Sequence, residues 1–426
     1  MFLSTAFATL ARTKNGGVAT PERSPESPVV PVLAPVLVVG AGPVGLSAAI
    51  ALRSLGVPAV VLEADGQNRE RPGSRALFVH RESLRLLESG APGLAGELTG
   101  FGVVWHTKRT LYRGREVFAK TYPAPPADAA PFTSLRQVDT ERFLRKACEQ
   151  AGATVHWGAR VSGLRVDPDG VEVATEDGRT FAGSHVIAAD GARSTVRRAL
   201  GITMSGGRSA GFHTTVDIAD PDFPMERLFH YHHPALGSRH VMTVPFAGGF
   251  QVDVQCAPQD TEARFSTPEA VREWLPRVVE RRHLDHILWI SSYRFNQVIA
   301  DRFAEGRVLL AGEAAHLFPP LGARGMNSGI ADAFAAADAI AIARGAHNPV
   351  RAAAAISGYD AARRSAAQRN NAAVSQALAH LRPRHWHTTA RQRAAAALSS
   401  VVPRFGAWLE NATYGPKTTS VRSGRY

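Results

Sequence analysis

The chain has 426 residues, of which 45% are hydrophobic and 20% are charged, a composition typical of a globular protein long enough for two fused domains. Its net charge is +12, from 49 Lys plus Arg against 37 Asp plus Glu. The arginines are scattered along the sequence rather than gathered on one periodic face, which disfavours nucleic acid as a partner. No run of about 18 apolar residues indicates a membrane span.

Residues 1–34 precede the first predicted strand and end in a proline-rich stretch. Phe2 to Leu10 is apolar, but no basic residue precedes it and no clear cleavage site follows, so a signal peptide matches poorly. We predict a disordered extension. The only cysteines, Cys148 and Cys256, have no metal-like spacing, which indicates a reducing, cytoplasmic compartment and no metal site.

The stretch 36–65 has the order of elements found in a dinucleotide-binding unit. It consists of a strand Val36–Val39, a turn Gly40–Gly45 (GAGPVG), an Ala-rich helix Leu46–Leu55, a strand Ala59–Leu62 and then Glu63. Because strand, turn, helix, strand and acid follow within about thirty residues, we predict an adenine dinucleotide site rather than an ordinary βαβ unit. The pattern fits both NAD and FAD.

Each glycine of this turn has a separate expected task. Gly40 allows the tight turn, Gly42 lets the backbone approach a pyrophosphate, and Gly45 lets the helix lie close to the strand. Glu63, at the end of the second strand, is expected to bind a ribose diol.

Two side chains along the next hundred residues are candidates for the same ligand. Arg75 falls in a loop ahead of a predicted helix, Arg81 to Leu87, where it is either a charge partner of the pyrophosphate or a solvated surface arginine. Gln137 stands just before an amphipathic helix and offers a neutral amide.

A small β-meander is predicted next, followed by a buried strand. The meander strands are Thr154–Trp157, Val161–Val166, Gly170–Thr175 and Thr180–Phe181. The buried strand Val186–Ala189 delivers Asp190 to the carboxyl edge of a doubly wound sheet, where ligands bind. Asp190 can meet sugar hydroxyls or order the turn.

Residues 204–299 contain several long strands and predict an antiparallel sheet that forms one wall of a cavity. The polar and soft side chains that could reach a substrate there are His213, His230, Tyr231, Met242, Gln251, Asp253 and Tyr293. Strand alternation sends about half of them outward, and the sequence does not set the register.

The chain then returns to the first fold. A strand from Gly306 ends near Glu313, and a glycine-rich loop, residues 317–329, opens onto a helix predicted over Ile330–Ala343. The N–H groups of Met326 and Asn327 are expected at the positive end of that helix, where they suit a delocalised anion. Arg324 is expected to point to solvent.

Together these segments resemble the FAD-dependent aromatic hydroxylases of the p-hydroxybenzoate hydroxylase type, the group A flavoprotein monooxygenases. The resemblance covers roughly residues 35–364 and implies an α/β fold: a Rossmann-like FAD-binding domain with an inserted, mainly antiparallel β-sheet substrate domain and a C-terminal helical segment. The implied parts are an extension 1–34, FAD-binding parts 35–110, 134–203 and 300–345, a loop and partial substrate wall 111–133, the substrate sheet 204–299 and the helical segment 346–426.

The resemblance also implies roles for residues. The residues implied at FAD are Gly40, Gly42, Pro43, Val44, Gly45 and Glu63 at the ADP half, Arg75 and Gln137 along the pyrophosphate and ribityl chain, Asp190 between FAD and nicotinamide, Glu313 at the ribityl chain, and Pro320, Gly322, Ala323, Gly325, Met326 and Asn327 around the isoalloxazine. Glu313 stands where the family usually has Asp, and Ala323 where it often has Gly.

The implied reaction uses no protein nucleophile. NAD(P)H reduces FAD, a C4a-hydroperoxyflavin forms with O2, and its distal oxygen passes to a small, electron-rich, aromatic substrate, in secondary metabolism or aromatic catabolism. Other chemistry on the same scaffold stays open: a dehydrogenase, an amine N-oxygenase, a Baeyer-Villiger-type oxygenase, or a non-catalytic binder of a small molecule.

Overall fold

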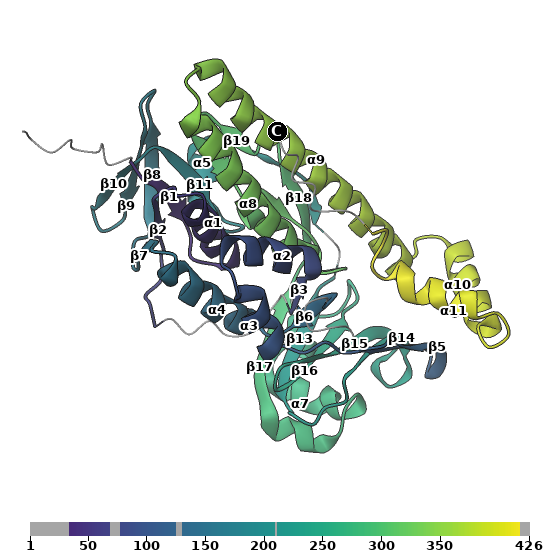
Figure 1. Cartoon of the computed structure of the whole chain (residues 1–426). Coiled ribbons are helices and arrows are strands. Elements are labelled where there is room, and N and C mark those ends of the chain that lie inside the picture. The colour runs from purple at the N-terminus through teal and green to yellow at the C-terminus, as the bar shows by residue number, and fades with distance from the viewer. Residues whose placement is uncertain (1–33, 69–76, 125–129, 209–210, 418–426) are drawn as a thin grey trace, which may run out of the picture. The chain divides into compact units, whose positions relative to one another are not determined.

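The computed structural model describes residues 34–68, 77–124, 130–208 and 211–417 (Figure 1). These residues belong to one compact unit that begins at Ala34. Arg75 and the predicted extension, apart from Ala34, lie outside the described residues.

A six-stranded sheet forms the dinucleotide-type part of the fold. Its strands are, in spatial order, β19 (Ala304–Glu305), β20 (Val308–Leu310), β11 (His185–Ala188), β1 (Val36–Val39), β2 (Ala59–Leu62) and β7 (Thr154–His156). All are parallel except β19, which pairs antiparallel with β20 at the edge. Every residue of β1, β11 and β20 is buried, as expected of strands covered on both faces.

The bounds of β1 and β2 agree with the prediction, whereas the role of β7 does not. The strand predicted at Thr154–Trp157 was expected in the meander, but β7 pairs in parallel with β2 and extends the main sheet. The meander therefore consists of three strands, β8 (Val161–Val166), β9 (Val171–Thr175) and β10 (Thr180–Gly183).

Helix α1 (Pro43–Ser54) packs closely against the strand before it. A Cβ atom at Gly45 would lie 1.8 Å from the carbonyl oxygen of Gly40, so no side chain fits there. The other helices of this part are α2 (Arg81–Gly90), α3 (Leu94–Phe101), α4 (Gln137–Gln150) and α5 (Thr195–Ala199). A two-stranded sheet is formed by β3 (Phe78–His80), which precedes α2 in the chain, and β6 (Phe132–Ser134), which precedes α4.

A second large sheet has seven strands. They are, in spatial order, β17 (Ile287–Tyr293), β13 (His213–Ala219), β16 (Gly249–Gln255), β15 (Arg239–Phe246), β14 (Glu226–His233), β4 (Thr107–Tyr112) and β5 (Arg115–Thr121). β4 pairs in parallel with β14, and the other pairs are antiparallel. The predicted boundary at residue 110 therefore falls inside β4, which belongs to this sheet.

One face of the seven-stranded sheet is apolar and covered. Val216, Val252 and Val254 pack in a cluster with Trp274 of α7 (Pro268–Trp274), which follows α6 (Glu262–Phe265). A third sheet, β12 (Met204–Arg208), β18 (Asn296–Ala300) and β21 (His316–Leu317), brings the end of this region beside the glycine-rich loop.

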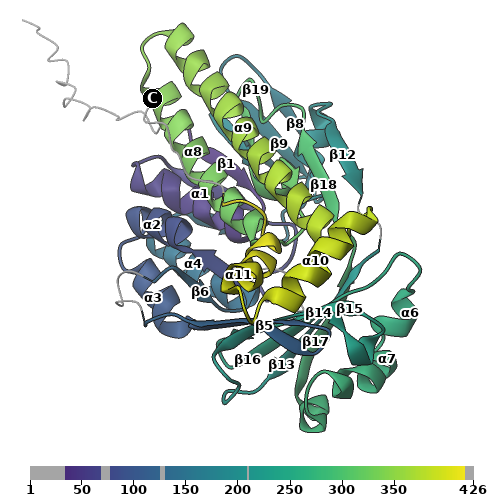
Figure 2. The same cartoon turned by 90° about the vertical axis from the view of Figure 1, so that its right-hand side faces the viewer.

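Four helices complete the chain: α8 (Arg324–Gly345), α9 (Pro349–Leu381), α10 (Trp386–Leu398) and α11 (Pro403–Ala412). Helices α8 and α9 lie side by side, and α10 and α11 follow as a shorter pair (Figures 1 and 2). Glu410 of α11 accepts hydrogen bonds from Thr110 (2.6 Å) and Arg227, which fixes α11 to the seven-stranded sheet. No helix in the described ranges is both long and apolar enough to cross a membrane.

Candidate active site

The glycine turn after β1 leaves an open helix start at the carboxyl edge of the parallel sheet. Gly40 has a φ of +102°, and a Cβ there would lie 2.5 Å from a backbone carbonyl oxygen beyond β11, so the turn requires glycine. Gly42 caps α1 with extended backbone, and Pro43 occupies the first helical position. The N–H groups of Val44 and Gly45 have no acceptor within the helix, an arrangement that binds phosphate.

Glu63 is held beside this turn. Its Oε2 accepts a hydrogen bond from the N–H of Ala41 (2.6 Å), and its Oε1 accepts one from the N–H of Asp65 (3.0 Å). The side chain is buried, with 4% exposed. A carboxylate has further acceptor sites, so Glu63 can also accept from two neighbouring hydroxyls of a ribose.

Asp190 lies at the same edge, beyond β11. Its Oδ2 accepts from the N–H groups of Thr195 (2.8 Å) and Val196 (3.1 Å) at the start of α5, so of the two expected tasks it orders the turn. Its Oδ1 is buried and has no hydrogen-bond partner in the described part of the chain. That oxygen is available to a hydroxyl or amide of a ligand.

A buried carboxylate that the sequence reasoning missed holds the third segment in place. Asp332 accepts from the N–H of Gly312 (3.1 Å), from Nε2 of His316 (2.7 Å) and from Nε of Arg363 (2.7 Å). Burial raises the pKa of Asp332, but the charges of Arg363 and His316 lower it by more, so the net shift is downward. An acid among the alanines of this helix was a signal for it, but Asp338, which is exposed, gives the same signal.

The glycine-rich loop ends in a turn at residues 320–323, and α8 follows it with one side of its first turn uncovered. The N–H of Ala323 donates to the carbonyl of Pro320 (3.0 Å), and Gly322 and Ala323 have φ values of +75° and +51°. A Cβ at Gly325 would meet no atom within 4 Å. The backbone at the start of α8 is thus bare on one side, as a cradle for a flat ring requires.

Helix α8 begins earlier than predicted, which changes the role of Asn327. The residues whose N–H groups lack an acceptor within the helix are Arg324, Gly325 and Met326, because the helix begins at Arg324 and not near Asn327. The structure places Asn327 one turn into the helix, and contact between its N–H group and a ligand stays a prediction. The Asn327 side chain joins α8 to the β3–α2 segment.

The hydrogen bonds of the Asn327 side chain use all its polar atoms. Oδ1 accepts from the N–H of His80 (2.9 Å) and from Oγ of Ser83 (2.7 Å). Nδ2 donates to the carbonyls of Phe78 (2.9 Å) and Ala323 (2.8 Å). The Asn327 side chain therefore fixes the helix start.

Arg324 does not point to solvent, contrary to expectation. Its guanidinium donates to Oδ1 of Asn370 (3.1 Å) and to the carbonyls of Tyr414 (3.1 Å) and Pro416 (2.7 Å). The side chain thus ties the end of the described chain to the glycine-rich loop, while its backbone N–H remains at the helix start.

The remaining two flavin candidates lie less deeply. Nε2 of Gln137, the first residue of α4, donates to Oε1 of Glu141 (3.0 Å). Glu313 is exposed on a single helical turn, Gly312–Ala314, just beyond β20. Its side chain is therefore accessible to solvent, a few residues before the glycine-rich loop.

The sheet register decides which substrate candidates share a face. His213 lies opposite Tyr293 on β17, and Met242 lies opposite Asp253 on β16, so these side chains stand on the face away from α7. Gln251, two residues from Asp253, points the same way. We call these five residues the polar face.

The polar face lies next to the start of α8. Val244 and Phe246 of β15, on the same face as Met242, pack against Leu77. The following residue, Phe78, accepts the hydrogen bond from Asn327 described above. The start of α8 and the polar face are therefore joined through one short segment.

Three members of the polar face form a hydrogen-bonded chain. Nδ1 of His213 lies 2.7 Å from Oδ1 of Asp253, and the hydroxyl of Tyr293 donates to Oδ2 of Asp253 (3.1 Å). The ring of Phe295 packs on His213 with centroids 4.2 Å apart. Nε2 of His213 is buried and has no hydrogen-bond partner among the described residues.

His230 and Tyr231 are used elsewhere. His230 lies opposite Val241, which packs in the cluster with α7, and its Nε2 accepts from the N–H of Gly114 (2.9 Å). The hydroxyl of Tyr231 is fully buried, donates to the carbonyl of Leu409 (2.6 Å) and lies 2.9 Å from Nε2 of His380. Both side chains hold the sheet together rather than facing a ligand.

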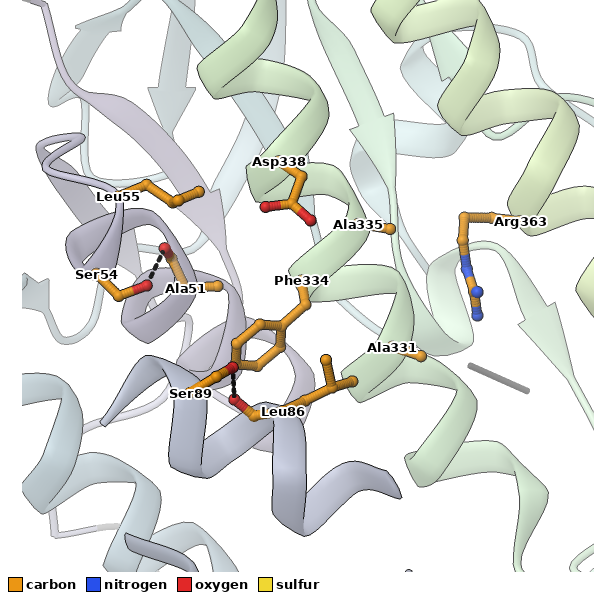
Figure 3. A pocket seen from close by; sticks show the side chains of 10 residues that line it. All are labelled: Ala51, Ser54, Leu55, Leu86, Ser89, Ala331, Phe334, Ala335, Asp338 and Arg363. Carbon is orange, nitrogen blue, oxygen red and sulfur yellow. Dashed lines mark hydrogen bonds between the residues drawn. The ribbon is translucent and has the colours of Figure 1, made fainter. Parts of the chain in front are cut away.

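A separate cavity of about 350 Å³ lies between α1, α2 and α8 (Figure 3). Phe334, Leu86 and Leu55 line it together with Asp338, and Arg363 reaches it from α9. None of the residues predicted for the site lines this cavity, and we assign it no part in the site.

Comparison with known proteins agrees with this geometry. A family model described as an FAD binding domain matches residues 33–374, which is most of the chain. The chain is similar to the 3-(3-hydroxy-phenyl)propionate/3-hydroxycinnamic acid hydroxylase of Klebsiella pneumoniae subsp. pneumoniae, at 29% identity over 321 residues, covering 72% of this chain and 55% of the relative. It is also similar to the dialkyldecalin synthase of Streptomyces rugosporus, at 31% identity over 309 residues, covering 70% and 63%.

Among solved structures, the p-nitrophenol 4-monooxygenase of Pseudomonas putida DLL-E4 has a similar fold, with a TM-score of 0.72 and 23% identity over 91% of this chain and 99% of the other. The chain spans only about half to two-thirds of the length of the two curated relatives. The helix starts, the placed acids Glu63 and Asp190 and the bare backbone at Gly325 fit FAD.

Proposed function

The chain belongs to the family of FAD-binding monooxygenases, and from this premise we propose that it uses NAD(P)H and O2 to hydroxylate a small aromatic substrate that carries a hydroxyl group. One observation carries the proposal. The start of α8, where a Cβ at Gly325 would meet nothing, is joined by Leu77 and Phe78 to a sheet face that carries a hydrogen-bonded His213–Asp253 pair.

The flavin side of the site acts mainly through backbone. The free N–H groups at the start of α1 would hold the pyrophosphate, and Glu63 would hold the ribose. The N–H groups of Gly325 and Met326, in the first turn of α8, would place positive partial charge beside the ring. When bound, FAD would supply the transfer of electrons from NAD(P)H to O2 and the transfer of oxygen to the substrate.

The substrate side would act through side chains. Asp253 fixes the proton of His213 on Nδ1, which leaves the lone pair on Nε2 as an acceptor. A substrate hydroxyl that donates a hydrogen bond to this nitrogen would have its proton drawn towards His213. The aromatic ring that carries the hydroxyl would then be more electron-rich, which favours its attack on oxygen. Tyr293, by donating to Asp253, keeps that carboxylate in place.

A second candidate function is a ring-forming reaction without net oxidation. It is favoured by the similarity to a dialkyldecalin synthase at 31% identity, which is comparable to the similarity to the hydroxylase. In that reaction FAD would be bound but not consumed in redox turnover. A dehydrogenase, an amine N-oxygenase, a Baeyer-Villiger-type oxygenase and a non-catalytic binder stay open as further alternatives.

The experiment is single-turnover chemistry with isotopic oxygen. FAD-loaded protein is mixed with NADPH or NADH, ¹⁸O2 and a panel of phenols, and products are measured by mass spectrometry. We expect one ¹⁸O atom in the product and consumption of one NAD(P)H per product. Product that forms without O2 and NAD(P)H would favour the ring-forming reaction, and turnover with a dye acceptor in the absence of O2 would favour a dehydrogenase.

A further inference from the structure

The C-terminal helices carry most of the net positive charge of the chain. Residues 361–409 contain eight arginines and no aspartate or glutamate, so their charge of +8 is two-thirds of the total of +12. The arginines are spread along this segment, and its charge is high because no acid offsets them.

Four of these arginines donate hydrogen bonds to the fold, and of these four Arg369 is exposed. Those with acceptors are Arg363 on Asp332, Arg364 on the carbonyl of Asp301, Arg369 on Oγ of Ser365 and Arg382 on the carbonyl of Cys256. The other four, which are exposed, are Arg384, Arg391, Arg393 and Arg404. None of these four forms an ion pair within the ranges that the structure describes.

Large apolar side chains are exposed among the same four arginines. Trp386 at the start of α10 is 82% exposed, Leu398 at its end is 47% exposed, and Val401 in the following turn is 78% exposed. Helix α10 faces the viewer in Figure 2. An exposed tryptophan beside exposed aliphatic residues is unusual for a surface without a partner.

The helical period gathers these residues on one side. At 3.6 residues per turn the exposed positions of α10 between Arg391 and Arg393 form a continuous strip of Trp386, His387, Ala390, Ala394, Ala397 and Leu398. Arg391 and Arg393 stand at the two edges of the strip. The opposite side, with Gln392, Ala395 and Ala396, is buried against the fold.

We propose that this strip, together with Arg384, Val401 and Arg404, docks the protein on the surface of an anionic phospholipid bilayer. We call it the α10 surface. The proposal goes beyond the proposed function and does not depend on it. Helix α10 would lie in the plane of the interface, with Trp386 and Leu398 at the level of the headgroups and the arginines reaching the phosphates.

Three features favour a lipid surface over a protein partner. The four exposed charges have one sign and form no ion pair with any described residue, although Glu116 lines the same surface hollow as Arg404. One-signed charge suits the uniform charge of an anionic leaflet rather than the paired charges of a protein interface. Tryptophan prefers the boundary between water and lipid. The strip is a helix of 13 residues, too short to cross a bilayer but long enough to lie on one.

The test is co-sedimentation of the full-length, FAD-loaded protein with sucrose-filled vesicles. The two vesicle types are pure phosphatidylcholine and phosphatidylcholine with about one-third phosphatidylglycerol. We expect binding to the anionic vesicles only, reduced at least tenfold in 0.5 M NaCl. Equal binding to both types, or none to either, would overturn the proposal.

Variants locate the binding surface. Arg391→Glu with Arg393→Glu should lower the partition coefficient at least tenfold, because each arginine near an anionic surface contributes about fivefold. The matched control is Arg281→Glu with Arg351→Glu, two exposed arginines outside the α10 surface, which should change it no more than about threefold. Trp386→Ser tests the apolar anchor and should lower binding without removing its salt dependence.

Other occupants give different results. If the α10 surface joins two copies of the chain, the Glu variants shift the mass in sedimentation velocity and leave vesicle binding unchanged. If it binds an acidic protein or nucleic acid, the vesicles do not sediment the wild-type protein. Either result overturns the proposal, and flavin content and circular dichroism show whether each variant is folded.

Discussion

The carboxyl edge of the six-stranded sheet and the polar face of the seven-stranded sheet build their sites in opposite ways. At the carboxyl edge, the groups that can meet a ligand are mostly backbone N–H groups at two helix starts. Gly40 and Gly45, which tolerate no Cβ, place the start of α1, whereas a Cβ at Gly325 in the first turn of α8 would meet no atom within 4 Å. On the polar face, they are side chains such as His213 and Asp253 on neighbouring strands. The backbone of that face is occupied by the sheet ladder itself.

This difference explains which specificity each region can have. Backbone groups fix the position of a cofactor that every member of a family shares, because they do not depend on the identity of most side chains. Side chains on a sheet face can change one at a time without disturbing the ladder. We therefore expect the first region to determine the cofactor and the second to determine the substrate.

The largest effect should come from filling the closest backbone contact. Gly45→Ala places a methyl group 1.8 Å from the carbonyl oxygen of Gly40, which forces α1 away from β1. We expect a loss of more than about 4 kcal/mol in the free energy of unfolding and no FAD binding. Urea unfolding and flavin absorbance measure both.

The matched control for that change is Gly100→Ala in α3. A Cβ there meets nothing within 4 Å, and alanine is the better helix former, so stability should stay equal or rise by up to about 1 kcal/mol. If Gly45→Ala behaves like Gly100→Ala, the close contact of α1 with β1 does not determine the cofactor site.

The next largest effect is expected for Asp332, which holds Gly312 and α9 in place beside the glycine-rich loop. Asp332→Asn removes the charge that pairs with Arg363 and His316 in a buried place, and we expect a loss of about 3 kcal/mol in the free energy of unfolding. Asp338→Asn, on the same helix but exposed, should change it by less than about 0.5 kcal/mol.

The pH dependence of stability should identify the same carboxylate. The folded pKa of Asp332 lies below its ordinary value of 3.8, so its contribution is complete above that value and is lost as pH falls through the folded pKa. Wild-type stability should therefore fall below about pH 4 more steeply than that of Asp332→Asn. Parallel curves for the two proteins would show that Asp332 is not the responsible acid.

The two regions also differ in what could be predicted. The strands β1 and β2, the glycine turn and Glu63 were readable because each residue depends only on its neighbours in sequence. The roles of Asn327 and Asp332 were not, since their partners, such as Ser83 and Arg363, lie far along the chain. The start of α8 at Arg324 could not be predicted either. The residue before it, Ala323, has a left-handed backbone, and at such a position a glycine would have indicated a helix boundary.

On the polar face, residue types alone could not separate ligand-facing from structural side chains. His213 and His230 are alike in sequence context and in burial. Only the register places His213 beside Asp253 and turns His230 to the covered side. A one-residue shift of β14 would have exchanged the faces of all its side chains.

A smaller effect is expected when the polar face loses its acceptor. His213→Gln should lower kcat for a phenolic substrate about 100-fold at pH 7 and leave KM and flavin content nearly unchanged. The loss should shrink towards pH 10, where the phenol ionises without help. His230→Gln, also buried, is the control and should leave the pH profile of kcat unchanged. A loss for His213→Gln that is equal at every pH would mean that its role is structural only.

The smallest expected change in stability belongs to Gly325→Ala, and it separates the cradle from the fold most directly. In the FAD-free protein the new methyl group meets nothing within 4 Å, and alanine suits a helix start, so the free energy of unfolding should change by less than about 0.5 kcal/mol. If a flavin ring lies against the start of α8, the same methyl group occupies its place, and the Kd for FAD should rise about tenfold or more, which corresponds to about 1.4 kcal/mol. Fluorescence titration of FAD into the apoprotein measures this. Because the fold is left intact, an unchanged Kd could not be explained by misfolding, and it would mean that the ring binds away from this helix and that the open space at Gly325 has another use.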